Sequence, residues 1–263
     1  MRKLRFFEPP AAEAELIMEK IDISKLLCEK ETVTLDIVGD SITHGLNHCS
    51  ADETYTAQFA CMLAEKFTEA SVNRYDGIVS SGEKPMAYFD GPIEAAVRNG
   101  NKHIDVIRNG IGGNTVRRAI ERIGDFTGTL ANGRTADVTF FMFGINDALK
   151  SDSKKYVTAE KFYEDYSELI EKFRKIDDSA IVIMSATTND QTIDAHVAET
   201  ARLAAEYGFI YIDQHKVWDA HYDPAASNFG QGDWLSNEDA RDACHPTPLG
   251  AKMIASEMMK YVE

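Results

Sequence analysis

Four short segments of the sequence carry residue types that can together transfer an acyl group. They are residues 39–43 (GDSIT), 109–115 (NGIGGNT), 144–147 (GIND) and 242–246 (DACHP). Each segment alone is weak evidence for catalysis. A serine after a strand is usually a helix cap, and a glycine-rich turn commonly separates a strand from a helix. All four together, at predicted strand ends or just before a predicted helix, are far less expected by chance.

The first and last segments supply the groups of nucleophilic catalysis. Ser41 is the candidate nucleophile, and it requires a base that takes its proton. His245 is the candidate base, and it would later return the proton to the leaving alcohol. Asp242 stands three residues earlier in the same turn, where it would hold the imidazole tautomer and stabilise the imidazolium. These residues predict a Ser41–His245–Asp242 triad.

The second and third segments supply donors for the tetrahedral oxyanion, which needs two or three aimed hydrogen bonds. The backbone N–H groups of Ser41 and Gly113 and the side-chain amide of Asn146 can provide them. Glycine at position 113 lets the backbone approach a substrate that a Cβ would obstruct. The predicted oxyanion hole is therefore formed by Ser41, Gly113 and Asn146.

The elements that must position these groups alternate along the chain. Short apolar runs rich in Val, Ile and Phe predict buried parallel strands at residues 33–38, 104–108, 138–143, 180–184 and 209–212. Amphipathic segments predict helices at residues 55–67, 116–125, 158–176, 193–207 and 247–262. Repeated strand–helix units predict an α/β protein with a five-stranded parallel sheet in a flavodoxin-like, doubly wound layout. Such folds bind ligands at the carboxyl ends of their strands, where the segments lie.

At this point the sequence resembles the SGNH hydrolase superfamily, the GDSL-type esterases and acylhydrolases. Those enzymes are named for a Ser, Gly, Asn and His in four ordered blocks, matched here by GDSIT, GIGGNT, GIND and DACH. The resemblance covers the chain from about residue 33 to its end, and it implies a three-layer α/β/α fold and the roles given above. Either Gly112 or Gly113 could be the block's donor; Gly113 is preferred because it directly precedes the Asn-Thr pair.

Two segments depart from a minimal catalytic core. Residues 1–32 are expected to form an N-terminal arm, partly helical over residues 11–30, packed on a hydrolase domain of residues 33–263. Residues 71–103 are expected to be an insertion between the first helix of the domain and the second strand. Either segment could shape the pocket or a contact between copies in a homo-oligomer.

Cofactor and metal sites are disfavoured by the pattern. Thr115 stands where a dinucleotide-binding fingerprint requires its last glycine. His44 and His48 are four residues apart, but no thiol or carboxylate completes an obvious ligand set, so an exposed or capping role is favoured over a metal ligand. Cys244 has no base separate from the one assigned to Ser41, and is interpreted as a packing residue. No cofactor and no metal are expected.

Composition narrows the classes of partner and compartment. The 263 residues include 28 Lys and Arg against 43 Asp and Glu, a net charge of −15. Such a surface repels phosphate backbones and anionic lipid, so nucleic-acid and membrane roles are disfavoured. A polyanionic substrate such as a coenzyme A thioester would need a local basic pocket. No apolar run has the length of a membrane span and the N-terminal residues lack a signal-peptide pattern, so a cytoplasmic location is expected.

The function predicted is a serine esterase that removes a short acyl group, acetyl above all, from a carbohydrate or similar polyol. A lysophospholipase or thioesterase of the same superfamily is the alternative, although no long apolar lid is evident. A flavodoxin-like binding protein without activity is a third interpretation. The aromatic stretch from Trp218 to Trp234 is interpreted either as a loop anchored in the core or as the rim of a sugar pocket, with these two residues binding substrate.

Overall fold

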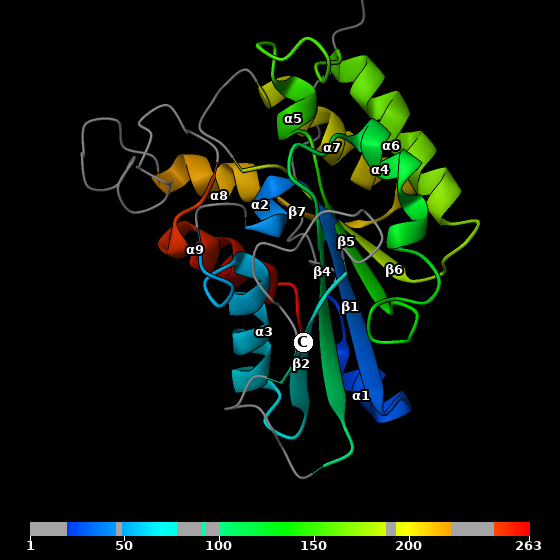
Figure 1. Ribbon diagram of the computed structural model, residues 1–263, viewed down its shortest axis with the longest axis vertical. Coiled ribbons are helices and arrows are strands. Elements are labelled where there is room, and N and C mark those ends of the chain that lie inside the picture. Colours follow the sequence, from blue (N-terminus) through cyan, green and yellow to red (C-terminus); the bar gives the residue numbers. More distant parts are fainter. Residues whose placement is uncertain (1–19, 46–48, 78–90, 93–99, 188–192, 222–244) are drawn as a thin grey trace, which may run out of the picture.

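The computed structural model describes residues 20–45, 49–77, 91–92, 100–187, 193–221 and 245–263. Its centre is one sheet with the strand order β3-β2-β4-β1-β5-β6-β7 (Figure 1). All neighbours are parallel except the short β3, which pairs antiparallel with β2. The strands are β1 (Thr32–Gly39), β2 (Ser71–Asp76), β3 (Gly91–Pro92), β4 (His103–Gly110), β5 (Val138–Met142), β6 (Ala180–Met184) and β7 (Ile210–Ile212).

The predicted fold class is confirmed. The five predicted strands are β1, β4, β5, β6 and β7, and their order β4-β1-β5-β6-β7 is the flavodoxin-like arrangement, in which the first strand lies between the second and the third. The count of five strands was too low, because residues 71–103 contribute β2 and β3 to the same sheet. Only the first two residues of β2 are buried, so this strand shows no continuous apolar run.

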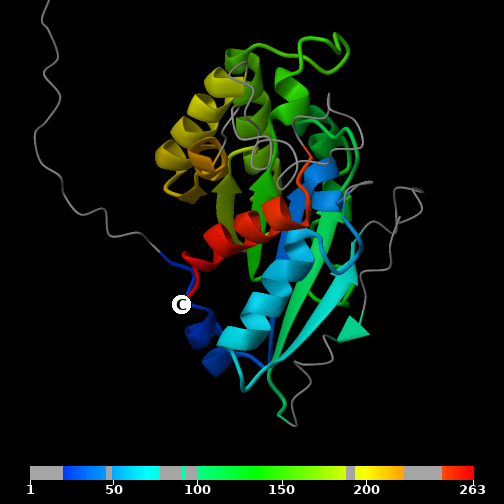
Figure 2. The same cartoon turned by 90° about the vertical axis from the view of Figure 1, so that its left-hand side faces the viewer.

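Helices cover both faces of the sheet, which gives three layers. The helices are α1 (Ile23–Glu29), α2 (Ser41–His44), α3 (Tyr55–Lys66), α4 (Val116–Glu121), α5 (Ile145–Ala148), α6 (Ala159–Phe173), α7 (Asp194–Tyr207), α8 (Gln214–His221) and α9 (Pro248–Met259). Residues of α1, α3 and α9 share one buried apolar cluster, and Figure 2 looks onto the face that α3 and α9 cover. Residues of α4, α6 and α7 form a second cluster on the other face.

The side chains of the strands alternate between these two clusters. Along β5, Phe140 and Met142 belong to the α3/α9 cluster, whereas Phe141 belongs to the α4/α6/α7 cluster. This alternation follows from the period of two in a strand, and burial on both faces explains the continuous apolar runs in the sequence. The rings of Phe141 and Phe173 pack edge to face, nearly perpendicular, with centroids 5.2 Å apart. This contact holds α6 against the centre of the sheet.

The described part of the predicted N-terminal arm begins at Lys20. Ile21 forms an isolated parallel bridge with Val262, and the helix α1 that follows buries Ile23 and Leu27 in the α3/α9 cluster. Residues 1–19 lie outside the described residues, and the boundary between arm and domain at residue 32 stays a prediction. None of the helices within the described ranges combines the length and the apolar character that a membrane span requires.

A carboxyl group lies buried in the middle of the sheet. Asp36 of β1 is fully buried and accepts a hydrogen bond of 2.7 Å from the side-chain amide of Asn109. Its second oxygen has no hydrogen-bond partner among the described residues. Because burial penalises the charged form, the pKa of Asp36 is raised from 3.8 to about 8, despite the opposing hydrogen bond from Asn109.

This shift predicts that the protein becomes less stable as the pH rises from about 4 to about 8. In that range the folded Asp36 keeps a proton that the unfolded chain has lost, so the free energy of unfolding falls by up to about 1.4 kcal/mol per pH unit. The side chain at position 36 in the Asp36→Asn variant cannot titrate in this range. When the free energy of unfolding is measured with urea at a series of pH values, its slope against pH should be smaller in the variant by that amount. An unchanged slope in Asp36→Asn would assign the effect to other buried carboxyl groups.

Candidate active site

The serine turn is fixed by the residue before it. Asp40 follows the last residue of β1 and caps α2, with its Oδ1 accepting a hydrogen bond of 2.9 Å from the N–H of Ile42. Ser41 is therefore the first residue of α2, and it is buried except for 7% of its surface. The helix ends after one turn, where Gly45 adopts a left-handed conformation.

His245 reaches this serine from the far end of the chain. Its Nε2 lies 2.7 Å from the Oγ of Ser41, although 204 residues separate the two. His245 stands just before α9, which begins with Thr247 as its cap and Pro248 in its first turn. With Nε2 unprotonated the hydroxyl donates to the imidazole, which is the arrangement that a general base requires.

The glycine-rich segment brings β4 against the serine turn. A Cβ on Gly110 would lie 2.2 Å from the backbone nitrogen of His44, so only glycine lets α2 rest on the end of β4. Arg122 donates hydrogen bonds to the carbonyls of Gly39 (3.2 Å) and Asn109 (3.0 Å), and thereby joins the ends of β1 and β4. In the turn that follows, Gly113 has a φ of 69°, which L side chains rarely adopt.

Asn146 links the first three segments. It lies on α5, directly after β5, and its Nδ2 donates a hydrogen bond of 3.0 Å to the carbonyl of Asn114. The same nitrogen lies 3.4 Å from the Oδ2 of Asp40. Together with the contact between Ser41 and His245, these bonds bring residues of all four predicted segments to one edge of the sheet, at the carboxyl ends of β1, β4 and β5.

Two buried carboxyl groups lie beneath this cluster. Burial raises the pKa of Asp40 from 3.8 to about 6, and the hydrogen bond from Ile42 opposes part of the rise. Burial also raises the pKa of Asp147, the residue after Asn146, to about 7. The nearby charge of Asp40 adds to the rise for Asp147. With both pKa values raised, the site is less negative at neutral pH than its sequence indicates. Sequence reasoning assigned no role to Asp40, although its place in the GDS triplet is a usable signal.

A small cavity lies beside the serine and the histidine, on the α3/α9 side of the sheet. Its volume of ≈ 10 Å³ gives room for about one water-sized group. Its walls are formed by Ser41, Ile42, Gly45, Cys49, Thr54, Tyr55, His245, Pro246 and Ala251. The hydroxyl of Tyr55 is held 2.8 Å from that of Thr43, so this wall is rigid. No pattern in the sequence pointed to Cys49, Thr54, Tyr55 or Ala251.

The structure does not describe every predicted site residue. Asp242 and Trp234 lie outside the described residues, as does Cys244. Trp218 lies on α8 rather than in a loop; its side chain is 3% exposed and belongs to the α3/α9 cluster, which leaves it little surface for stacking on a ligand.

The histidine pair considered for metal binding is only half described. His44 is buried in the last turn of α2, so, of the exposed or capping role expected for it, the exposed alternative was wrong. His48 lies outside the described residues. Within the described ranges, no three His, Cys, Asp or Glu side chains are grouped as a metal site would require.

A model of the GDSL-like lipase/acylhydrolase family matches residues 87–253, more than half of the chain. The chain belongs to that family. The resemblance predicted from the four segments is thus confirmed, and this GDSL-like protein is a carboxylic ester hydrolase. The matched range contains Gly113, Asn146 and His245 but begins after Ser41. The contact of 2.7 Å between Ser41 and His245 joins the GDSIT segment to the matched range, as does the contact between Asp40 and Asn146.

Solved structures share the fold of the GDSL-like chain at low sequence identity. An acetyl xylan esterase, AlAXEase, is 19% identical, with a TM-score of 0.60 over 87% of this chain and 98% of that one. The hydrolase LAE5 from the metagenome of Lake Arreo, Spain, is 19% identical, with a TM-score of 0.59 over 87% and 94%. Axe2, an acetylxylan esterase from Geobacillus stearothermophilus, is 18% identical, with a TM-score of 0.59 over 87% and 93%. A search of curated proteins returns no match.

The position of Asn146 predicts that its replacement by alanine lowers the rate of hydrolysis. If its amide donates to the developing oxyanion, kcat of Asn146→Ala should fall about a hundredfold to a thousandfold with little change in KM. Asn132→Ala is the matched control, because the Asn132 amide bonds Thr34 and Asp105 near the starts of β1 and β4, at the opposite ends of these strands from the site segments. A change confined to KM in Asn146→Ala would make this residue a substrate-positioning group.

Proposed function

We propose that this GDSL-like hydrolase is a serine esterase that removes short acyl groups, acetyl above all, from carbohydrate esters. The observation that carries the proposal is the separation of 2.7 Å between the Ser41 Oγ and the His245 Nε2. It is the distance at which a histidine can take the proton of a serine hydroxyl. Family membership supports ester hydrolysis, and the finer proposals depend on the surroundings of this pair.

In the proposed reaction the Ser41 oxygen attacks the ester carbonyl while its proton passes to His245 Nε2. The tetrahedral intermediate collapses when the imidazolium returns this proton to the leaving alcohol, which leaves the acyl group on Ser41. Water then attacks the acyl-enzyme with His245 again as base, and the acid is released. We propose Asp242 as the group that orients His245, on the basis of its place three residues earlier in the chain.

We further propose that the oxyanion is held by the N–H groups of Ser41 and Gly113 and by the amide of Asn146. One N–H of that amide donates to Asn114, whereas the contact with Asp40 is long at 3.4 Å. A contact of that length is weak, so the second N–H retains capacity to donate to an oxyanion. The positive φ of Gly113 supports its place in the turn, since a side chain there would strain the backbone.

The size of the cavity beside Ser41 supports a short acyl group. The cavity has room for about one water-sized group, and a methyl group is of similar size, whereas a longer acyl chain would have to displace Ile42 or the buried ring of Tyr55. A buried apolar wall favours the acetyl methyl over a polar substituent. A lysophospholipase or thioesterase that buries a long chain would need a larger apolar space.

Two observations bear on the carbohydrate part of the proposal. Structural neighbours are described as acetyl xylan esterases and as an acetyl-xylooligosaccharide esterase, but at 18–19% identity they show a shared fold. Trp234 is the residue we propose for the sugar rim, since the indole of Trp218 is packed in the core. A sugar ring stacks well on an aromatic side chain that has one apolar face available.

The role of Ser41 predicts loss of activity without loss of the fold. The Ser41→Ala variant loses only a hydroxyl, and should hydrolyse p-nitrophenyl acetate several orders of magnitude more slowly than the wild type. A fluorophosphonate probe should label the wild type at Ser41 and leave the variant unlabelled, as read by mass spectrometry. Undiminished turnover by a variant of verified mass would refute the assignment of the nucleophile.

The cavity predicts a steep dependence on acyl length. Specificity constants for p-nitrophenyl esters should be highest for acetate and fall from C2 to C12. Ile42→Val removes one methyl group from the wall, and should raise the ratio of butyrate to acetate hydrolysis by roughly tenfold, the lower end of what one methylene is worth in an apolar pocket. Ile37→Val, which lies in the same core cluster but does not line the cavity, should leave the ratio unchanged.

A maximum at C8 or beyond in the wild type would reject the short-chain proposal and favour the lysophospholipase or thioesterase alternative.

A further inference from the structure

A second pocket lies next to the site, between α4, α5 and α6. It has a volume of ≈ 540 Å³, and five cationic side chains line it: Arg117, Arg118, Lys154, Lys155 and Lys161. The acidic residues in its lining are Glu121, Asp147 and Asp165. We refer to it as the cationic pocket. Such a concentration of positive charge is unexpected on a chain whose net charge is −15.

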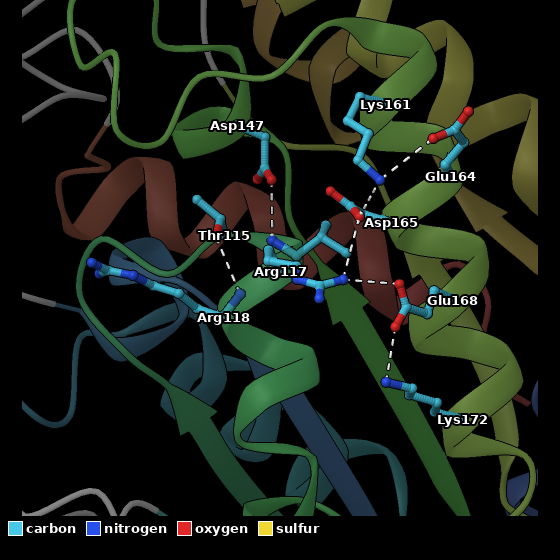
Figure 3. A network of polar contacts seen from close by, with 10 residues as sticks. Thr115, Arg117, Arg118, Asp147, Lys161, Glu164, Asp165, Glu168 and Lys172 are labelled. Atoms are coloured by element: carbon cyan, nitrogen blue, oxygen red, sulfur yellow. Dashed lines mark hydrogen bonds and ion pairs between the residues drawn. The ribbon is translucent and has the colours of Figure 1, made fainter.

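Three of the five cations are paired with carboxylates. Figure 3 shows Arg117 between Asp165 (3.8 Å) and Glu168 (2.9 Å), and Lys161 against Asp165 (2.9 Å). The Nζ of Lys155 lies 3.4 Å from a carboxylate oxygen of Asp152.

The other two cations, Arg118 and Lys154, form no ion pair with any described residue. Arg118 makes a contact of 3.5 Å with the carbonyl of Gly113, and in Figure 3 it extends away from the paired group. A guanidinium has five N–H donors in a fixed fork, so most of its hydrogen-bonding capacity is available to a carboxylate or a phosphate.

The pocket adjoins the proposed oxyanion hole. A Cβ placed on Gly113 would lie 3.0 Å from the Nζ of Lys155, and Asp147 directly follows Asn146. The cationic pocket is lined by α4 and α6, whereas the small cavity beside Ser41 is lined by α3 and α9. Figure 1 shows α2 between these two groups of helices. An ester bound at Ser41 with its acyl group in the small cavity would therefore direct its alcohol part toward the cationic pocket.

Asp147 adds a buried polar group to the same pocket. It is 2% exposed, and its Oδ1 accepts a hydrogen bond of 3.1 Å from the N–H of Val116. Its Oδ2 has no hydrogen-bond partner among the described residues. A buried oxygen of this kind is costly unless a ligand bonds to it, and a sugar hydroxyl is a suitable partner. Because burial raises the pKa of Asp147 to about 7, its own charge opposes an anion only partly at neutral pH.

We propose that the cationic pocket binds an acidic sugar unit in the alcohol part of the substrate, with its oxyanion on Arg118 and Lys154 and a hydroxyl on Asp147. The proposal rests on the esterase function proposed above, because it assigns the leaving group of that reaction. It also answers a difficulty raised by the sequence: an acidic surface repels an anionic substrate unless a local basic pocket attracts it. The shared chemistry is an oxyanion on a sugar, supplied either by a uronic acid carboxylate or by a sugar phosphate.

The kinetic experiment compares substrates that differ only in charge. Monoacetyl esters of methyl β-D-glucoside, methyl β-D-glucuronoside and methyl β-D-glucoside 6-phosphate are hydrolysed by the wild type and by Arg118→Gln/Lys154→Gln. The wild type should favour at least one charged ester over the neutral one in kcat/KM, mainly through KM. In the double variant this ratio should fall about tenfold. The charged ester whose kcat/KM, relative to the neutral ester, falls more in the double variant identifies the source of the oxyanion.

Lys172→Gln is the matched control, because Lys172 lies on α6 outside the lining and pairs with Glu168. It should leave the charged-to-neutral ratio unchanged. An equal loss in Lys172→Gln would show a general effect of surface charge and overturn the proposal. A wild type that does not favour either charged ester would also overturn it.

A binding experiment separates failure of the pocket from failure of the esterase assignment. Ser41→Ala is titrated with methyl β-D-glucuronoside, methyl β-D-glucoside and methyl β-D-glucoside 6-phosphate, and binding is followed by calorimetry or by NMR shifts. A charged glycoside should bind at least tenfold more tightly than the neutral one, and the preference should disappear when Arg118 and Lys154 are also replaced. If no ester is hydrolysed but this preference is found, the pocket stands and the esterase proposal falls. If esters are hydrolysed and no preference is found, the pocket proposal falls alone.

Discussion

The register of three central strands is the constraint on which the site depends. Gly39 at the end of β1 pairs with Gly110 of β4 on one side and with Met142 of β5 on the other. The three strands therefore end at one level, and the turns that follow them begin side by side. A slip of one residue in any strand would exchange the faces of its side chains, so the two apolar clusters fix this register. The absence of a side chain on Gly110 then lets α2 lie against β4.

Buried carboxyl groups in the same region lower the stability of the fold. Asp36 on β1, Asp40 just after β1 and Asp147 on α5 are carboxyl groups with raised pKa values, and burial is the main cause in each. Desolvation of a carboxylate is unfavourable, and buried carboxyl groups are typical of positions with a structural or catalytic role. Asp40 caps the serine helix and contacts Asn146, while Asp147 binds the backbone of α4. Asp40 thus holds two predicted segments of the site together, and Asp147 holds its segment against the start of α4.

The sequence predicted those elements whose hydrophobic pattern and capping residues agree with their place in the fold. The runs that became β1 and β5 are buried on both faces, and the helix α6 carries a regular apolar stripe behind its Thr158 cap. The strand β2 was missed because three of its last four residues, Asn73, Arg74 and Asp76, are polar, and all four are only partly buried. The helix α8 was missed because Trp218 was interpreted with the polar residues that follow it in the chain.

The pockets could not be predicted from the sequence, since their walls come from distant segments. Tyr55 and Ala251 lie almost two hundred positions apart in the chain, yet both line the cavity at Ser41. The cationic pocket was hidden for a second reason. Arg118 and Lys154 are separated in sequence, and a net charge summed over the whole chain conceals a local excess of the opposite sign.

The long chain separation between Ser41 and His245 has a consequence for how catalytic competence arises during folding. The helices α6 and α7 and their strands can form through short-range contacts, whereas the meeting of these two side chains closes a loop of 204 residues. It requires β1 in the sheet and α9 packed on the opposite face from α6 at the same time. Enzymatic turnover is therefore a marker of completed assembly, and a chain can hold most of its helical structure before it gains its reactive centre.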